Sequence, residues 1–274
     1  MKRHMHALVH SLTTGKVVFR DDGLDALEEI DTLERFFAER FAYLKRWRAL
    51  RNENLQALEG ETYRLVSLGF DCFIRTLSNR WGIKPTKAMG EPTLPFDLAT
   101  HDPEGVAALI DNAFEGYLDP ASLTQDDRQF WCNYRYRACF SHEPADTDLD
   151  GLLERYQRRV RDFDAVMDGS RPVLFCQHLE ASMPESRLYT VLKERYASID
   201  FSLCIIKTYP AEDEVYRIET PADDYSILHI SYPFSGYVWY RAEDYAAAEG
   251  LAFELKTVTY LKEKLKALLE RNRS

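Results

Sequence analysis

The feature that most constrains the fold is an alternation of apolar and amphipathic segments in the C-terminal half of the chain. The apolar runs PVLFCQ (172–177), FSLCIIKTY (201–209) and SILHISYP (226–233) are short and partly β-branched, as buried strands are. Helical spacing marks PESRLYTVLKERYA (184–197) and AFELKTVTYLKEKLKALLE (252–270). Strands that alternate with helices favour parallel pairing. The sequence therefore predicts an α/β fold, with a mainly parallel central sheet and helices on both faces.

The N-terminal part of the chain predicts a long helix followed by the first strand. Apolar residues recur at steps of three and four over residues 22–58, which is typical of an amphipathic helix. The run YRLVSL (63–68) ends at Gly69 and is typical of a buried strand. We therefore expect an N-terminal helical extension over residues 1–60 and an α/β domain over residues 61–274. The apolar stripe of the helix packs either on the core or on a second copy, so a homodimer through residues 22–58 is a candidate.

The other segments are less strongly patterned. We expect a short strand or hairpin near 17–19, a loop over 83–102, helices over 103–118 and 146–167, and a strand or hairpin near 130–140.

Composition limits the classes of function. The 274 residues carry a net charge of −10, and an acidic balance disfavours binding to nucleic acid and to anionic membranes. The chain has no apolar run long enough to span a membrane, and its N-terminus does not resemble a secretory signal. Its 5 cysteines, an odd number, are typical of a reduced compartment. We expect a cytoplasmic protein.

Motifs for metals and nucleotides are missing from the sequence. Cys132 and Cys139 are seven residues apart, and Cys176 and Cys204 fall in separate apolar runs, so no CxxC pair occurs. Neither GxGxxG nor GxxxxGK[ST] is present. The sequence therefore predicts no metal and no cofactor.

The segment VSLGFDC places Cys72 where the first strand turns into a helix. Free N–H groups at a helix N-terminus stabilise a thiolate and lower its pKa. Gly69 permits a sharp turn, and the backbone of Gly69, Phe70 and Asp71 could then leave N–H groups free for an oxyanion. Cys72 is therefore a candidate nucleophile. The alternative is a buried structural cysteine, a common core residue.

Several motifs together resemble a known family. They are SLGFDC (67–72), LPFD (94–97), FSH (140–142), ERYQRRVRDF (154–163) and VLF (173–175). In combination they resemble a bacterial family described as putative papain-like cysteine peptidases, over roughly residues 63–209. Leu98 stands where the family usually has Trp.

The resemblance implies roles for three residues. Cys72 matches the turn cysteine, Asp97 the acid of the Pro-Phe-Asp block and His142 the family histidine. A thiol needs a base, and an acid commonly orients that base. His142 is the preferred base. His178, after the run 172–177, is the alternative.

Neighbouring polar residues leave alternatives open. Asp97 either orients a histidine or caps a turn, and Glu180 could orient His178. The basic helix face carries Arg155, Arg158, Arg159 and Arg161. This face is either solvated, with local ion pairs to Glu154 and Asp162, or an anchor for an anionic substrate group.

Two hypotheses of function follow from these residues. The first is a cysteine-dependent hydrolase or acyl transferase that acts on a small molecule or a peptide through Cys72, His142 and Asp97. The second is a non-catalytic binding or interaction protein that retains the α/β fold.

Overall fold

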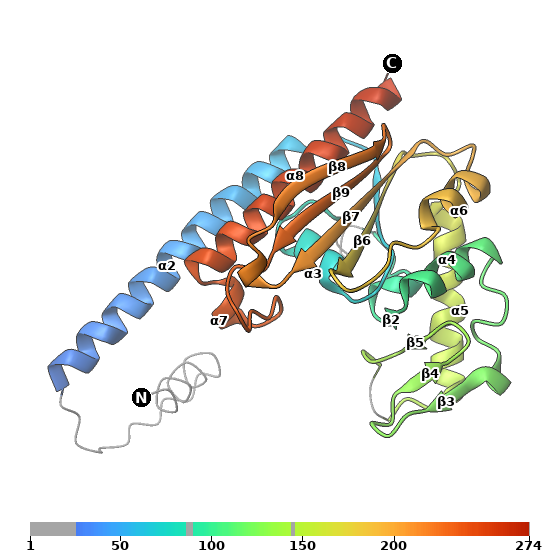
Figure 1. Ribbon diagram of the computed structural model, residues 1–274, viewed down its shortest axis with the longest axis horizontal. Helices are drawn as coiled ribbons and strands as arrows, with labels where there is room; N and C mark the ends of the chain where they lie inside the picture. Colours follow the sequence, from blue (N-terminus) through green and yellow to red (C-terminus); the bar gives the residue numbers. More distant parts are fainter. Residues whose placement is uncertain (1–25, 86–89, 144–145, 274) are drawn as a thin grey trace. The chain divides into compact units, whose positions relative to one another are not determined.

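A computed structural model describes residues 26–85, 90–143 and 146–273 of the chain (Figure 1). The chain divides into two compact units, residues 1–45 and 46–274. Helix α2 (Ala26–Ala57) agrees with the expected N-terminal helix. The strand expected near residues 17–19 lies outside the described residues.

The larger sheet has five strands in the order β1-β6-β7-β9-β8. Their bounds are β1 Arg64–Ser67, β6 Val173–Glu180, β7 Phe201–Tyr209, β8 Tyr216–Ala222 and β9 Tyr225–Ser231. The first four strands in that order pair in parallel, and β8 pairs antiparallel to β9 at the edge. The expected mainly parallel sheet is therefore confirmed. The sequence did not predict β8, because most of its side chains are exposed and leave no apolar pattern.

The central strands bury both sets of their alternating side chains. One set includes Phe175, Leu203 and Ile227, which belong to the hydrophobic core. The other set faces the C-terminal helix: Ser226 Oγ lies 2.8 Å from Tyr260 Oη. Burial of both sets explains why these strands read as continuous apolar runs.

Helices supply further parts of this core and cover the sheet. The same core includes residues of α4 (Pro103–Asp111), α5 (Leu149–Val166) and α6 (Leu188–Arg195). Helix α8 (Ala248–Arg273) contacts β6 and β7, and Figure 1 shows it running along the sheet. The remaining helices are α3 (Phe73–Arg80), α7 (Ala242–Tyr245), and the 3₁₀ turns η2 (Pro95–Asp97), η3 (Pro120–Ser122) and η4 (Ala211–Asp213).

Two helix boundaries differ from the sequence-based expectation. The helix expected over 103–118 ends at Asp111, because Ala113 and Phe114 have φ values of 55° and 61° in the left-handed region. Helix α5 begins at Leu149, where the Asp148 side chain accepts a hydrogen bond from the Gly151 N–H. Caps of this kind satisfy backbone groups that the helix leaves free.

A second, smaller sheet is antiparallel and has the order β2-β5-β4-β3. Its strands are β2 Thr100–His101, β3 Leu123–Gln125, β4 Trp131–Asn133 and β5 Ala138–Cys139. The strand or hairpin expected near residues 130–140 corresponds to β4 and β5. The other two strands were not expected, because runs of two or three residues are too short to show a period of two.

Helix α3, which begins beside Cys72, is fixed to α8 by a buried polar cluster. The Glu254 carboxylate accepts hydrogen bonds from the Arg80 guanidinium and, at 2.7 Å, from Trp81 Nε1. The Arg80 guanidinium also lies 3.7 Å from the centre of the Tyr245 ring. Burial raises the pKa of Glu254 to about 7, against the effect of these partners.

Among the described residues, no helix combines the length and the apolar character that crossing a membrane requires.

Candidate active site

Cys72 lies where the chain leaves β1 and enters α3. Gly69 has a φ of 63°, a conformation that a residue with a side chain rarely adopts. The His101 N–H donates to the Phe70 carbonyl at 3.1 Å and so ties this turn to β2. Cys72 itself is the N-cap residue of α3, whereas Asp71 contributes by accepting from the Phe73 N–H at 3.0 Å. The thiol therefore stands at the carboxyl edge of the parallel strands, where open α/β sheets place their ligands.

His142 follows strand β5 of the smaller sheet and lies beside this thiol. Its Nε2 lies 3.2 Å from Cys72 Sγ, although the two residues are 70 positions apart in the sequence. Cys72 is half-buried and His142 is exposed. A nucleophile and a base within hydrogen-bonding distance form the basic unit of covalent catalysis. The structure thus brings together the two residues that the sequence analysis paired.

The segment that carries His142 is held by α5. Glu143 is buried and forms ion pairs with Arg155 and, at 3.0 Å, with Arg159. The Phe140 ring packs edge-on against the Tyr156 ring at 4.5 Å between centres. These contacts fix the chain on both sides of His142.

The basic face of α5 therefore has two parts. Arg155 and Arg159 pair with Glu143, not with the expected partners Glu154 and Asp162. Arg158 and Arg161 are exposed, as expected of a solvated face.

The electrostatics of the pair differ from the sequence-based expectation of a thiol with a lowered pKa. Burial and the adjacent Asp71 carboxylate raise the pKa of Cys72, against a smaller lowering by Thr76 and Arg75. Burial, Arg75 and Arg159 lower the pKa of His142, and Asp71 opposes them. Between these two pKa values the pair is a neutral thiol and a neutral imidazole. The S–H group of Cys72 can then donate to His142 Nε2.

His178 binds Asp71 and does not contact the thiol. It lies inside β6 rather than after the strand, because β6 continues to Glu180, and it is buried. Its Nδ1 lies 3.0 Å from Asp71 Oδ2, and its Nε2 lies 3.0 Å from Thr208 Oγ1. Asp71, and not Glu180, is the carboxylate that orients this ring. With both nitrogens engaged, His178 serves to hold Asp71 beside the thiol.

Asp97 is buried in the turn η2. Its Oδ2 accepts from the Leu94 N–H at 2.9 Å, the turn-capping alternative of the two expected from the sequence. Its oxygens also lie 3.8 Å from Lys84 Nζ and 4.0 Å from Arg75 Nε. Within the part of the chain that the structure describes, Asp97 makes no hydrogen bond to His142. Its link to the site runs through Arg75, whose charge lowers the pKa of both Cys72 and His142.

Sequence reasoning missed the electrostatic roles of Asp71 and Glu143. Both are acids next to a candidate catalytic residue in the chain, which is the signal that could have found them. Neither could be given a partner from sequence, because His178 and the α5 arginines approach them only in the folded chain.

The charge of Asp71 provides a test of the pKa argument. The substitution Asp71→Asn keeps the shape of the side chain and removes the negative charge, so the pKa of Cys72 is expected to fall. Alkylation of Cys72 by iodoacetamide between about pH 7 and pH 8 should become several-fold faster, because the thiolate is the reactive form. Labelling rates by peptide mass spectrometry measure this.

The control for that experiment is Glu180→Gln, which neutralises an exposed carboxylate at the end of β6. We expect its labelling rate to equal that of the unmodified chain. Equal rates in both variants would contradict the role of Asp71.

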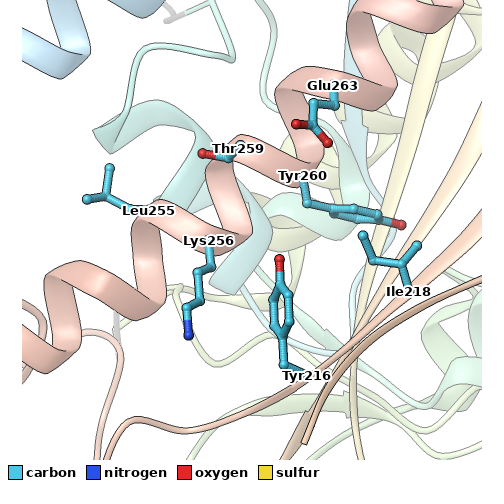
Figure 2. A pocket seen from close by; sticks show the side chains of 7 residues that line it. All are labelled: Tyr216, Ile218, Leu255, Lys256, Thr259, Tyr260 and Glu263. Atoms are coloured by element: carbon cyan, nitrogen blue, oxygen red, sulfur yellow. The ribbon is translucent and has the colours of Figure 1, made fainter.

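Two surface hollows lie away from this pair. One, of about 260 Å³, is formed between β8 and α8 by the residues that Figure 2 labels, among them Tyr216, Lys256 and Tyr260. The other, of about 460 Å³, lies beside Asp200 and Arg271. Neither is lined by Cys72 or His142.

One group of side chains has the donor atoms of a metal site. The thiols of Cys132 and Cys139 and a carboxylate oxygen of Asp126 lie within 4.8 Å of one another. The spacing rule applied to the sequence gave no indication of this group, because the β4–β5 hairpin brings the two cysteines together.

Comparisons with known proteins identify the family of this chain. A family model with the description "Putative papain-like cysteine peptidase" matches residues 63–209, which confirms the resemblance and the coverage expected from the sequence. The chain matches no curated protein and no solved structure.

Proposed function

The chain belongs to the family of putative papain-like cysteine peptidases, and from this premise we propose that it is a cysteine-dependent hydrolase with Cys72 as nucleophile and His142 as base. The observation that carries the proposal is the 3.2 Å separation of Cys72 Sγ and His142 Nε2. The family supports a hydrolase; the geometry supports the assignment of these two residues.

The proposed first step is acylation of the thiol. As Sγ of Cys72 attacks a carbonyl carbon, its proton passes to His142 Nε2 and the carbonyl oxygen gains the negative charge. Backbone N–H groups of residues 70–72 are the proposed donors to this oxyanion, since the Phe73 N–H already donates to Asp71. The bond to the leaving group then breaks, and the leaving group takes the proton from His142.

The second step is hydrolysis. Water attacks the acyl-enzyme while His142 accepts a proton from it, and collapse of the intermediate returns that proton to the sulfur as the acid is released. Asp71 favours the charged imidazolium that both steps require, since its carboxylate raises the pKa of His142. Asp97 then acts as a positioning residue that holds Arg75, 4.0 Å away, and not as the orienting acid of a triad.

An activated thioester probe tests the proposal. The probe should form one acyl adduct per chain on Cys72, seen as a mass increase and located by peptide mapping. The three buried cysteines, Cys132, Cys176 and Cys204, are internal controls. No adduct on Cys72, or equal slow modification of all five cysteines, would argue against a nucleophilic role.

Acyl transfer is the variant of this chemistry in which another nucleophile replaces water. The two are distinguished by incubating the acylated protein with amine, hydroxyl or sugar acceptors. Acceptor-dependent loss of the adduct with formation of an acylated product indicates a transferase. Loss at one rate in all solutions indicates a hydrolase. Peptide and acyl-coenzyme A donors should be compared in the acylation step.

The second candidate function is a non-catalytic binding protein. The observation that favours it is the raised pKa of Cys72, because a thiol that stays protonated is a weak nucleophile. This candidate predicts that His142→Ala leaves the reactivity of Cys72 unchanged. The hydrolase predicts a large loss.

A further inference from the structure

Two cysteines outside the Cys72 site face each other across the β4–β5 hairpin. Cys132 and Cys139 are direct partners in the antiparallel register. The Phe140 N–H donates to the Trp131 carbonyl at 2.9 Å, so the cysteines occupy the adjacent, non-hydrogen-bonded position. Residues at such positions have Cα atoms about 4.5 Å apart, at the short end of the range of about 4.4–6.8 Å that disulfides span. The backbone is therefore placed for a bond between them.

The two thiols differ in accessibility. Cys139 is partly exposed, whereas Cys132 is only 6% exposed. Burial, together with the hydrogen bond and charge of Cys139, raises the pKa of Cys132 to about 12. Cys139 is therefore the thiol that a reagent meets first. Once Cys139 has reacted, its thiol no longer contributes to the raised pKa of Cys132.

A metal ion bound by Cys132, Cys139 and Asp126 is the alternative to a disulfide. The hydrogen bonds of Asp126 disfavour this alternative. Asp126 Oδ1 accepts from the backbone N–H groups of Arg128 and Phe130 at 3.0 and 2.9 Å. Asp126 Oδ2 accepts from Arg128 Nε and Nη2 at 3.1 and 2.9 Å. Both carboxylate oxygens are thus engaged, and a guanidinium cation stands beside them. The two thiols remain as the reactive pair.

We propose that Cys132 and Cys139 form a reversible disulfide by exchange with a low-molecular-weight disulfide such as oxidised glutathione. The Cys139 thiolate attacks one sulfur of the reagent, forms a mixed disulfide and releases one thiol. The Cys132 thiolate then attacks the Cys139 sulfur and releases the second thiol. The two protons lost by the cysteines end on the two released thiols. The protein dithiol is oxidised, and the reagent is reduced.

The chain contains a matched control for this chemistry. Cys176 and Cys204 are also direct partners on neighbouring strands, β6 and β7. Both are 0% exposed, so a dissolved disulfide cannot reach them without unfolding. Because β6 and β7 are parallel and both thiols are buried, we expect no disulfide between Cys176 and Cys204.

The experiment is oxidation of the full-length folded chain with oxidised glutathione, followed by alkylation of free thiols and trypsin digestion. Arginines at 128, 135, 137 and 155 separate the two cysteines into peptides 129–135 and 138–155. We expect these peptides to be joined, with the loss of two hydrogen atoms, and to separate again in reducing agent. Cys176 and Cys204 should be recovered alkylated after denaturation.

Two variants test whether Cys139 reacts with glutathione before Cys132 does. Cys132→Ser should stop at a stable glutathione adduct on Cys139, and Cys139→Ser should give neither that adduct nor the joined peptides. Recovery of both Cys132 and Cys139 as alkylated thiols after the oxidation would overturn the proposal. So would a zinc ion that co-purifies at one per chain and is lost in both variants. None of these outcomes depends on the activity of Cys72.

Discussion

Replacing His142 by Ala is expected to slow acylation of Cys72 at neutral pH by about one hundred- to ten-thousand-fold, the usual contribution of a positioned general base. The thiol pKa is raised by burial and by Asp71, so the resting sulfur depends on His142 Nε2, 3.2 Å away, to remove its proton. The measurement is the single-turnover rate of adduct formation with the thioester probe, followed by intact mass across a range of pH.

The direction in which the acylation rate changes with pH is a separate prediction. Because the pKa of His142 is lowered by burial and by Arg75 and Arg159, the unprotonated base persists into mildly acidic solution. The acylation rate of the unmodified chain should therefore rise as pH passes upward through that pKa and then remain level until the thiol itself ionises. In His142→Ala only the rise at high pH should remain.

Two controls separate loss of the base from loss of the fold. Added imidazole should restore part of the rate in His142→Ala, because the space beside Cys72 is open to solvent. His178→Gln should have a much smaller effect, since His178 contacts Asp71 and not the sulfur. A large loss in His178→Gln together with a normal rate in His142→Ala would reverse the assignment of the base.

Replacing Glu254 by Ala is expected to lower the free energy of unfolding by about 3–5 kcal/mol, the usual cost of leaving a buried charge without its partner. Glu254 is 0% exposed, and its removal leaves Trp81 Nε1 without its acceptor and the Arg80 guanidinium without its carboxylate. Urea denaturation followed by tryptophan fluorescence measures the change. The exposed Glu263→Ala on the same helix is the control and should fall within about 0.5 kcal/mol of the unmodified chain.

The raised pKa of Glu254 predicts that the free energy of unfolding depends on pH. Its pKa in the folded chain is about 7 against a reference value of 4.5, so the folded chain binds this proton more tightly than the unfolded chain. The free energy of unfolding should therefore fall as pH rises from about 4.5 to about 7, by about 3 kcal/mol in total, and its contribution should be constant above that. Glu254→Gln should remove this slope. An unchanged slope would show that burial does not raise this pKa.

The sequence predicted the parts of the fold whose pattern is repeated over enough residues. The apolar runs that became β6, β7 and β9 and the long helices α2, α5 and α8 all show a period over several turns or strand residues. Strand β8 and the strands β2 and β3 of the smaller sheet were missed for different reasons. The side chains of β8 are largely solvated, whereas β2 and β3 are too short to show alternation.

For the candidate site, the sequence predicted which residues take part better than it predicted which residues contact one another. Cys72 and His142 could be paired from sequence because their motifs resemble those of one family. The partner of His178 could not be predicted. Its contact with Asp71, 107 residues away in the chain, depends on β6 lying beside β1. The role of Asp97 could not be predicted either. The Asp97 carboxylate accepts a hydrogen bond from the Leu94 N–H in a local turn. In the sequence, an acid that caps a turn looks the same as an acid that orients a histidine.

The proposed reactive pair is divided between the two sheets: Cys72 follows a strand of the parallel one, and His142 follows a strand of the antiparallel one. Neither sheet alone contains both groups. A sideways slip of about 1 Å between the sheets would separate sulfur from nitrogen while leaving every strand intact, and misplacements of that size cost about 100-fold in rate. Amino-acid changes where the two sheets meet are therefore expected to slow the proposed acylation without contacting either reacting atom.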